Sequence, residues 1–236
     1  MHGLERGTND AEQRLASDVK QTTDVKPPKE IGEAKSHFSD APKEIGDVNA
    51  KTQEIPHEIK DNQPKSFLDA DGNRCYTDDN GEVYRVNNDL VENCSYELNG
   101  YKYETDDIGR KISAEGKLRL KEESGYNPIK GVSLSDIGKG FEEKTDDRGH
   151  LIGNRFDGVG GIGNLVPQDK KFNQVEYNIF ENSLAKEVSQ GKDVYIKIDL
   201  DYSGASYRPN SFMVNYSIDG EEFIRVFSNE PRGEMK

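Results

Sequence analysis

The sequence predicts an α+β fold in which an antiparallel sheet packs with one long helix, preceded by a disordered segment. From Phe67 onward, short stretches of alternating apolar and polar residues are separated by turn pairs such as Asn99-Gly100, which is the pattern of β-hairpins. After Pro167, apolar residues recur with the spacing of a helix. The first 64 residues hold one Phe and no Tyr or Trp, too little apolar surface to build a core.

Residues 1–65 are predicted to be a disordered tether. They repeat the pentapeptide Pro-Lys-Glu-Ile-Gly at 28–32 and 42–46, and this period is shorter than the units of helical solenoids. Such a segment is either a plain linker or a site for a partner or an export adaptor. We expect residues 66–236 to form a single domain, with β-hairpins over 65–115 and a catalytic core over 116–236.

Composition excludes several classes of protein. The chain has 236 residues, of which 32% are hydrophobic and 33% charged, and no apolar run approaches the roughly 18 to 20 residues that span a bilayer. The N-terminus lacks the basic and then apolar pattern of a secretory signal, so we expect neither a membrane protein nor export by that route. The net charge of -13 repels polyphosphates unless a local basic cluster or a divalent metal offsets it.

The two cysteines, Cys75 and Cys94, lack the C-x-x-C spacing of a zinc site. They are able to form one disulfide that closes a short loop and stabilises the fold by roughly 3 kcal/mol at most. Disulfides persist in oxidising compartments. We therefore predict the Cys75–Cys94 disulfide on the condition that the protein is exported, and free thiols otherwise.

The expected strands lie on both sides of the helix. They are Tyr76, 83–86, 96–103, 117–120, 194–198, 212–218 and 223–227. The last two are joined by an Asp219-Gly220 pair, which favours a tight hairpin turn.

The acidic run at 69–73 superficially matches a calcium-binding loop. An EF-hand loop needs glycine at position six and a bidentate Glu at position twelve, whereas Gly72 is at position four and Asn80 at position twelve. We therefore interpret these acids as turn residues.

The long helix is predicted from an apolar stripe that ends at Gly191. Its members are Phe172, Val175, Ile179, Phe180, Leu184 and Val188. Because they fall on one side of a 3.6-residue helix, we expect them to share one face.

His150 is the one histidine of residues 66–236. This count excludes a zinc site of several histidines, and no G-x-S-x-G elbow accompanies it. A lone histidine is usually structural, so its neighbours decide its interpretation. It ends the run Asp-Arg-Gly-His at 147–150 and precedes a glycine-rich loop at 158–163. That loop leads into Asn-Leu-Val-Pro rather than into a helix, so we interpret it as a turn of the chain and not as a dinucleotide cradle.

The run at 147–150, the sequence Asn164-Leu165-Val166-Pro167, Asn173 and Glu181 together resemble the DNA/RNA non-specific endonucleases with a ββα-metal (His-Me finger) core. The order and the spacing carry the resemblance, because Asn164, Asn173 and Glu181 follow one another at short, regular intervals. The similarity is greatest to the EssD-like nuclease domains of type VII secretion, from about Tyr96 through the C-terminal strands.

The resemblance implies metal-assisted hydrolysis of phosphodiester bonds. His150 would be the general base on the attacking water, with Asp147 or a backbone carbonyl fixing its tautomer. Asn173 would hold Mg²⁺, or alternatively Mn²⁺, together with several waters. Asn164 and Glu181 would orient those waters, and the implied metal site includes Glu181.

Arginines are the predicted substrate-binding residues. Arg148 is the first candidate for a phosphate clamp, and Arg155 and Arg119 follow it. Lys170 and Lys171 lie near the proposed site in the sequence and offset part of the acidity of the domain.

The same residues also have simpler interpretations. Asn173 could be the N-cap of the helix, Asn164 a turn residue, and Glu181 a solvated residue of the helix surface. Arg148 could form a salt bridge with one of the two aspartates before it.

We therefore predict a metal-dependent, sugar-non-specific endonuclease that acts on DNA, RNA or both. The resemblance further implies the toxin domain of a secreted bacterial effector with a cognate immunity protein and no membrane partner, although the sequence leaves a cytoplasmic location open. Two alternatives remain: a non-catalytic binding module on the same fold, and a metal-dependent phosphoesterase of small substrates. Alanine at His150, Asn173 or Glu181 would leave a pure binder unaffected, and activity on nucleotides alone would select the phosphoesterase.

Overall fold

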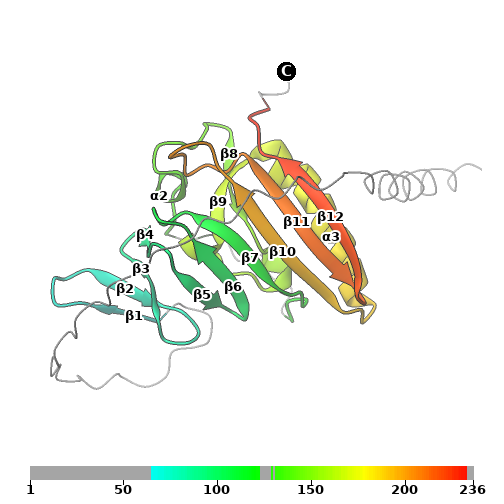
Figure 1. The fold of residues 1–236 in the computed structure, drawn as a ribbon, viewed down its shortest axis with the longest axis horizontal. Coiled ribbons are helices and arrows are strands. Elements are labelled where there is room, and N and C mark those ends of the chain that lie inside the picture. The colour runs from blue at the N-terminus through cyan, green and yellow to red at the C-terminus, as the bar shows by residue number, and fades with distance from the viewer. Residues whose placement is uncertain (1–64, 123–128, 130, 233–236) are drawn as a thin grey trace, which may run out of the picture. The chain divides into compact units, whose positions relative to one another are not determined.

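The computed structural model describes residues 65–122, 129 and 131–232. Three antiparallel sheets and two α-helices make up most of this part of the chain (Figure 1), so the predicted α+β class is confirmed. Apart from Lys65, the predicted tether and both of its repeats lie outside the described residues. Within the described part, no helix is long and apolar enough to cross a membrane.

A four-stranded sheet comes first in the described part of the chain. Its strands, in spatial order, are β1 (Lys65–Leu68), β2 (Arg74–Thr77), β3 (Val83–Val86) and β4 (Asp89–Leu90). In the first turn, the Asp69 carboxylate accepts the backbone N–H groups of Asp71 and Asn73 at 3.0 and 2.8 Å. The acids at 69–73 are thus turn residues, as predicted.

The central sheet has six strands in the spatial order β12-β11-β10-β7-β6-β5. Their bounds are β5 (Ser95–Leu98), β6 (Tyr101–Thr105), β7 (Lys111–Lys117), β10 (Val194–Asp201), β11 (Ser211–Ile218) and β12 (Glu221–Ser228). The expected division between 115 and 116 falls inside β7, and strands from both sides of it share this sheet, so it is no structural boundary. Of the strand expected at 117–120, only Lys117 belongs to β7; the Leu118 N–H still binds the Val194 carbonyl of β10, and the Lys121 N–H then binds the Arg155 carbonyl.

Two of the hairpin turns have the backbone that their sequences predict. Asn99 and Gly100 join β5 to β6 with φ of 53° and 72°, and Asp219 and Gly220 join β11 to β12 with φ of 51° and 85°. Two successive positive φ angles are typical of the type I′ turn, which matches the twist of a hairpin.

The third sheet is a hairpin of β8 (Asp146–His150) and β9 (Leu165–Asp169), joined by a long loop that contains the 3₁₀ turns η1 (Asn154–Phe156) and η2 (Ile162–Asn164). The short helix α2 (Leu134–Gly138) precedes it, and a helical segment comes after it, made of the π-helical turn η3 (Phe172–Tyr177) and α3 (Asn178–Ser189). Two paired strands followed by a helix are the ββα order that the sequence predicts.

The apolar face of the long helix differs from the predicted one. Val175 and Ile179 are 44% and 50% exposed, whereas Tyr177 is buried in their place. The cause is η3, because a π-helical turn holds more residues than an α-helical turn and so rotates the residues that come after it. A 3.6-residue period applied from Phe172 therefore misplaces Val175 and Ile179, whereas Phe172, Phe180 and Leu184 are buried as predicted.

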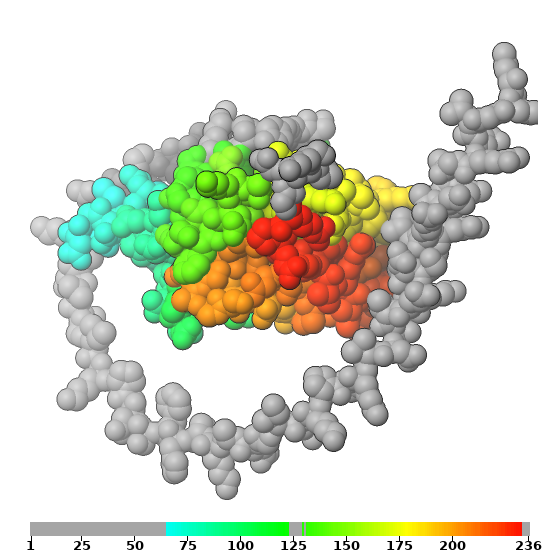
Figure 2. Space-filling view, turned by 90° about the horizontal axis from the view of Figure 1, so that it is seen from above, coloured from blue at the N-terminus to red at the C-terminus, as the bar shows by residue number. Residues whose placement is uncertain are grey.

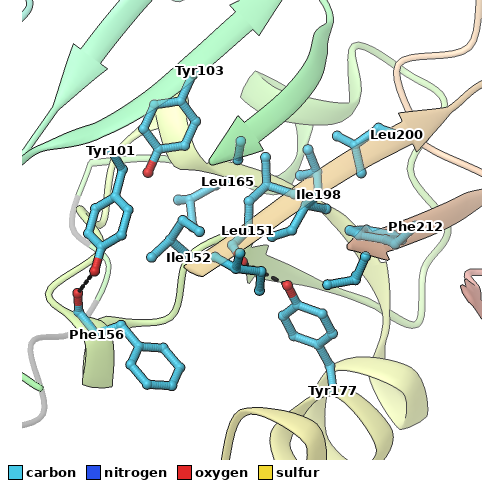
Figure 3. Close-up of a cluster of buried hydrophobic side chains, with 14 of the residues drawn as sticks. Tyr101, Tyr103, Leu151, Ile152, Phe156, Leu165, Tyr177, Ile198, Leu200 and Phe212 are labelled. Atoms are coloured by element: carbon cyan, nitrogen blue, oxygen red, sulfur yellow. Dashed lines mark hydrogen bonds between the residues drawn. The ribbon is translucent and has the colours of Figure 1, made fainter. Parts of the chain in front are cut away.

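One apolar core joins the central sheet to the helix and to the β8–β9 hairpin, and Figure 3 shows Tyr177 and Phe212 within it. The rings of Phe172 and Phe212 are 5.0 Å apart, and those of Phe180 and Phe227 are 5.4 Å apart. Each buried aromatic side chain of this kind contributes about 1.5–3 kcal/mol. These contacts place α3 against β11 and β12.

The conditional disulfide is absent from the structure, where Cys75 and Cys94 are free thiols. Cys75 lies in β2 of the first sheet and contacts the Asp69 carboxylate, whereas Cys94 directly precedes β5 of the central sheet and contacts the Ser95 carbonyl. The two thiols belong to different sheets and face different neighbours, so the predicted loop closure does not form.

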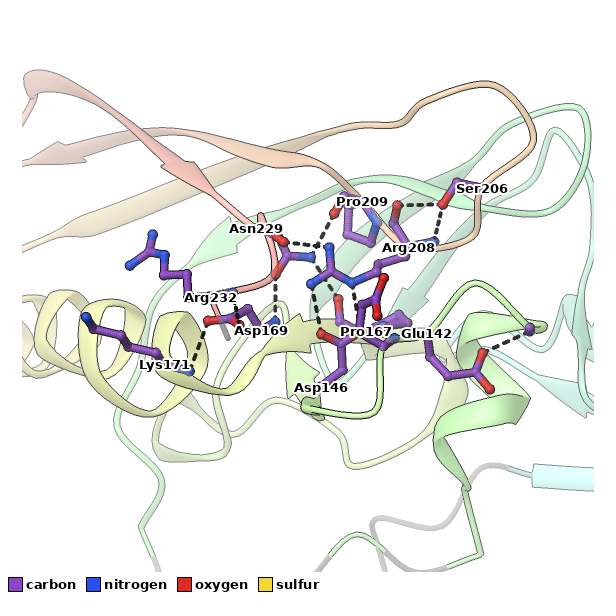
Figure 4. Close-up of polar contacts among 12 residues, drawn as sticks. Glu142, Asp146, Pro167, Asp169, Lys171, Ser206, Arg208, Pro209, Asn229 and Arg232 are labelled. Carbon is purple, nitrogen blue, oxygen red and sulfur yellow. Dashed lines mark hydrogen bonds and ion pairs between the residues drawn. The ribbon is translucent and has the colours of Figure 1, made fainter. Parts of the chain in front are cut away.

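A buried ion pair ties the β8–β9 hairpin to the C-terminal strands (Figure 4). The Arg208 guanidinium donates to both carboxylate oxygens of Asp146, at 2.7 and 2.8 Å, and also to the carbonyl of Asn229. The Asn229 side chain in turn donates to the Pro167 carbonyl and accepts the Asp169 N–H. The beginning of β8 and the end of β9 are therefore fixed to the residues that flank β11 and β12.

The C-terminal residues also contact the beginning of the helix. The Arg232 N–H binds the Asp169 carboxylate at 3.0 Å, and its guanidinium pairs with Glu176. Figure 2 shows this end of the chain, in red, against the yellow helical segment. The strand β9 and the helix are thus held from the same side.

Replacing Arg208 by Met should lower the free energy of unfolding by about 3–5 kcal/mol, because Asp146 would keep a buried charge without a partner. Lys117→Met is the matched control, since Lys117 pairs with Asp193 where both side chains are more than half exposed. Urea unfolding followed by circular dichroism measures both changes. Equal, small effects of the two variants would contradict a structural role for the buried pair.

Candidate active site

His150 is the last residue of β8 and pairs with Leu165 of β9. Its carbonyl accepts the Gln168 side-chain N–H at 3.2 Å, while its imidazole has no hydrogen bond to any described residue. The residue is partly buried, and burial lowers the pKa of the imidazole from 6.5 to about 4. His150 is therefore neutral at pH 7, which is the form that is able to accept a proton.

The Asp147 carboxylate faces the helix. Its Oδ2 accepts the side-chain N–H groups of Asn173 at 3.1 Å and of Gln174 at 2.8 Å. The expectation that Asp147 fixes the tautomer of His150 is therefore wrong, because its hydrogen bonds go to the two helix amides. The structure instead joins Asp147 to Asn173.

Asn173 is not the N-cap of the helix. The Asp169 Oδ1 accepts the backbone N–H groups of Lys171 and Phe172, at 3.1 and 3.0 Å, which is how a capping side chain satisfies the first free donors of a helix. Asn173 comes after this cap, inside η3, and its side chain points to β8.

Glu181 lies in the first turn of α3, and its side chain is 14% exposed. Burial raises the pKa of Glu181 to about 7, although Arg155 and the backbone N–H of Gly153 lower it. A Cβ on Gly153 would lie 2.2 Å from the Glu181 carboxylate, so only glycine admits the carboxylate there. The interpretation of Glu181 as a solvated surface residue is wrong.

Arg155 is occupied by the helix. Its guanidinium lies 3.5 Å from the Glu181 carboxylate and donates to the side-chain oxygens of Asn178 and Asn182. A phosphate would have to compete with these three partners. Within the described residues, the Arg155 guanidinium therefore contacts Glu181 and two asparagines, and it keeps no free pair of N–H groups for a phosphate.

Within the described residues, Arg148 keeps donors that have no partner. Its side chain is exposed, and one N–H donates to the Val132 carbonyl at 2.7 Å. It forms no ion pair with Asp146, which binds Arg208, or with Asp147, which binds the helix amides. The salt-bridge interpretation of Arg148 is wrong, and its remaining N–H groups are available to an anion.

Arg119 is an anchor for the long loop rather than a clamp at this site. Its guanidinium donates to the Asn99 carbonyl and to the Asp157 carboxylate and lies over the ring of Tyr101, 4.9 Å from its centroid. These partners join the central sheet to the loop after β8. One guanidinium nitrogen, Nη2, makes both of these hydrogen bonds, so this contact competes with the predicted substrate-binding role of Arg119.

Asn164 is fully buried, with 0% exposure. Its side chain accepts the Ile152 N–H at 3.0 Å and donates to the carbonyls of Ile152 and Val159, both at 2.8 Å. A side chain with these three bonds and no access to solvent does not orient catalytic water. Asn164 instead closes the long loop on itself, and its predicted catalytic role is corrected to a structural one.

The glycines of the loop serve close packing and not nucleotide binding. A Cβ on Gly158 would lie 1.9 Å from the Ile152 carbonyl oxygen, and Gly153 makes room for Glu181. Neither has a positive φ. Gly153 and Gly158 thus allow buried contacts, in addition to the turn of the chain that the sequence predicts.

Residues 92–220, more than half of the chain, match the family of DNA/RNA non-specific endonucleases. The chain belongs to this family. The resemblance carried by His150, Asn173 and Glu181 is thereby confirmed at the level of the family, and the predicted enzyme class, a nuclease, is that of the family.

The chain matches only part of the length of each relative. The chain is 35% identical over 139 residues to the type VII secretion system protein EssD of Staphylococcus aureus (strain USA300), covering 56% of this chain and 22% of that protein. It is 32% identical over 125 residues to the probable deoxyribonuclease RhsA of Dickeya dadantii (strain 3937), covering 51% of this chain and 8% of that protein. Both relatives are therefore much longer than the matched segment.

Among solved structures, the Sda1 nuclease with a bound zinc ion is similar to 55% of this chain and to 73% of its own, with 21% sequence identity and a TM-score of 0.39.

Three residues that form hydrogen bonds to Asp146, Asp147 or His150 have no role in the sequence-based prediction. Gln174 shares the Asp147 carboxylate with Asn173, and its place directly after Asn173 was an available signal. Gln168 holds the carbonyl of His150, and Arg208 holds Asp146 from 62 residues away. No local pattern marks a contact over such a distance in the chain.

Asn164→Ala should lower the free energy of unfolding by about 3 kcal/mol or more, because it leaves buried groups of Ile152 and Val159 without partners. Asn88→Ala is the control, since Asn88 is exposed and makes one surface side-chain bond, to Asp136. Chemical unfolding measures the difference. An Asn164→Ala protein as stable as wild type but without nuclease activity would restore the catalytic role that the sequence predicted.

Proposed function

We propose that the chain is a metal-dependent endonuclease that hydrolyses phosphodiester bonds of DNA, RNA or both, with residues 66–236 as its catalytic domain. One observation carries the proposal. Asp147, three residues before His150, binds Asn173, and Gly153, three residues after it, lies directly against the Glu181 carboxylate. The hairpin and loop that carry His150 thus contact both the amide of Asn173 and the buried carboxylate of Glu181.

In this proposal His150 is the general base. Its imidazole is neutral above about pH 4, has no competing hydrogen bond among the described residues, and is able to take a proton from water. General bases of this kind typically contribute about 100- to 10,000-fold in rate.

Two residues of the helical segment fit a hard divalent cation. Asn173 uses its N–H for Asp147, so its Oδ1 has no partner in the described part of the chain, and Glu181 offers a buried carboxylate. Oxygen atoms of this kind suit Mg²⁺ or Mn²⁺, which retain several waters. When bound, the cation would stabilise negative charge on the phosphate and on the departing oxygen.

Substrate binding is proposed to rest on local charge, because the chain as a whole is acidic. Arg148 has free N–H groups, and Lys170 and Lys171 are exposed at the start of the helix. Contacts to phosphates alone make binding indifferent to sequence and sensitive to salt.

The biological setting is proposed from the relatives. EssD is named a type VII secretion system protein and RhsA a probable deoxyribonuclease. We infer a secreted toxin, with residues 1–65 as its tether and a cognate immunity protein as its partner.

Purified full-length protein should degrade plasmid DNA or RNA with Mg²⁺, and EDTA should abolish the cleavage. His150→Ala should reduce the rate by about 100-fold or more, with an unchanged circular dichroism spectrum. His57→Ala, purified in parallel, is the matched control and should cut like wild type. Equal rates for His150→Ala and wild type would exclude His150 as the base.

The pKa of His150 should lie near 4, well below the ordinary value near 6.5. NMR titration of the histidine ring protons checks this, and the signal missing from a His150→Gln spectrum assigns it. Because the folded pKa is the lower one, protonation as the pH falls from 6.5 to 4 should also destabilise the fold. A titration midpoint at about 6.5 would show that the imidazole is solvated in solution and contradict the burial.

A further inference from the structure

Asp147 connects the two elements of the proposed site. It lies in β8, three residues before His150, and its Oδ2 accepts N–H groups from Asn173 and Gln174 of the helical segment. Within the described residues, these bonds, at 3.1 and 2.8 Å, are the only hydrogen bonds of its carboxylate. The strand of the base and the helix of the amide are thus joined at one carboxylate.

The chemistry of the pair fixes the orientation of the Asn173 amide. An ionised carboxylate only accepts hydrogen bonds, so the amide group that faces it is the NH₂ and not the carbonyl. A half-turn of the amide would place two acceptor oxygens against each other. The Asn173 Oδ1 is therefore turned away from Asp147, and in the described part of the chain it has no other partner.

We propose that Asp147 is a positioning residue that holds the Oδ1 of Asn173 in the orientation that binds the divalent cation. This inference rests on the proposed function, because it assumes that Asn173 is a cation ligand. It assigns Asp147 to the amide and not to His150. Residues that hold a metal ligand by hydrogen bonds typically change the affinity for the metal by about 10- to 100-fold when they are removed.

Gln174 offers a control that distinguishes the positioning of Asn173 by Asp147 from a purely structural link between β8 and the helix. It binds the same Oδ2 at a shorter distance, but its side chain is exposed and has no proposed contact with the cation. If Asp147 only ties β8 to the helix, loss of Gln174 should resemble loss of Asp147. If Asp147 positions Asn173, the two losses should differ.

The first experiment measures Mn²⁺ binding to the full chain by isothermal titration calorimetry, without substrate. Asp147→Ala should weaken the affinity by about 10- to 100-fold, whereas Gln174→Ala should stay close to wild type. Asp147→Asn should also stay close to wild type, because its carbonyl still accepts the two amide N–H groups. Equal losses for Asp147→Asn and Asp147→Ala would show that the charge acts, through direct contact with the cation, and would overturn the positioning role.

The second experiment measures cleavage against Mg²⁺ concentration. Asp147→Ala should need more Mg²⁺ for half-maximal activity but approach the wild-type rate at saturation, because His150 is untouched. A rate that stays low at saturating Mg²⁺, together with a changed His150 titration in NMR, would assign Asp147 to the base and overturn the inference.

Asn173→Ala separates the inference from the proposed function. If Asn173→Ala binds Mn²⁺ like wild type, the proposed cation site is wrong. If Asn173→Ala loses affinity while Asp147→Ala keeps it, the site stands and the positioning role of Asp147 is overturned. Thermal melting of each variant excludes loss of fold as the cause.

Discussion

The buried carbonyl groups of the loop between β8 and β9 are the constraint on which the site depends. Most of residues 151–164 are buried without belonging to a sheet, so their carbonyls need donors from side chains. Those donors are the hydroxyls of Tyr96, Tyr101 and Tyr177, the amides of Asn99 and Asn164, and the side-chain nitrogen of Lys111. The central sheet, the helix and the loop itself therefore determine its path together.

This path sets the geometry around His150. The loop begins directly after His150 and brings Gly153 against the Glu181 carboxylate, while Tyr177 of the helix holds the Leu151 carbonyl. The same demand explains why Asn164 and Arg119 are not free for substrate. The Asn164 side chain binds the Val159 carbonyl of the loop, and Arg119 binds the carboxylate of Asp157 in the same loop.

Local patterns predicted the parts of the fold that local forces determine. The Asn99-Gly100 and Asp219-Gly220 turns form because these pairs readily adopt positive φ, and the family pattern located His150 and its helix. The exposure of Val175 depends on the π-helical turn, which the periodicity of the sequence does not reveal. The partner of Asp146 lies 62 residues away in the chain, a contact for which one sequence holds no local signal.

The electrostatics of the site are dominated by burial. Burial alone accounts for the low pKa of His150, and burial is also the largest contribution to the raised pKa of Glu181. The shifts have opposite signs because burial disfavours the charged form of each group, imidazolium in one case and carboxylate in the other. The carboxylate nearest to His150 in the chain, that of Asp147, is held by two amides of the helix. Because it is engaged there and not with the imidazole, it does not favour the imidazolium, and the fold maintains His150 in the neutral form that a general base requires.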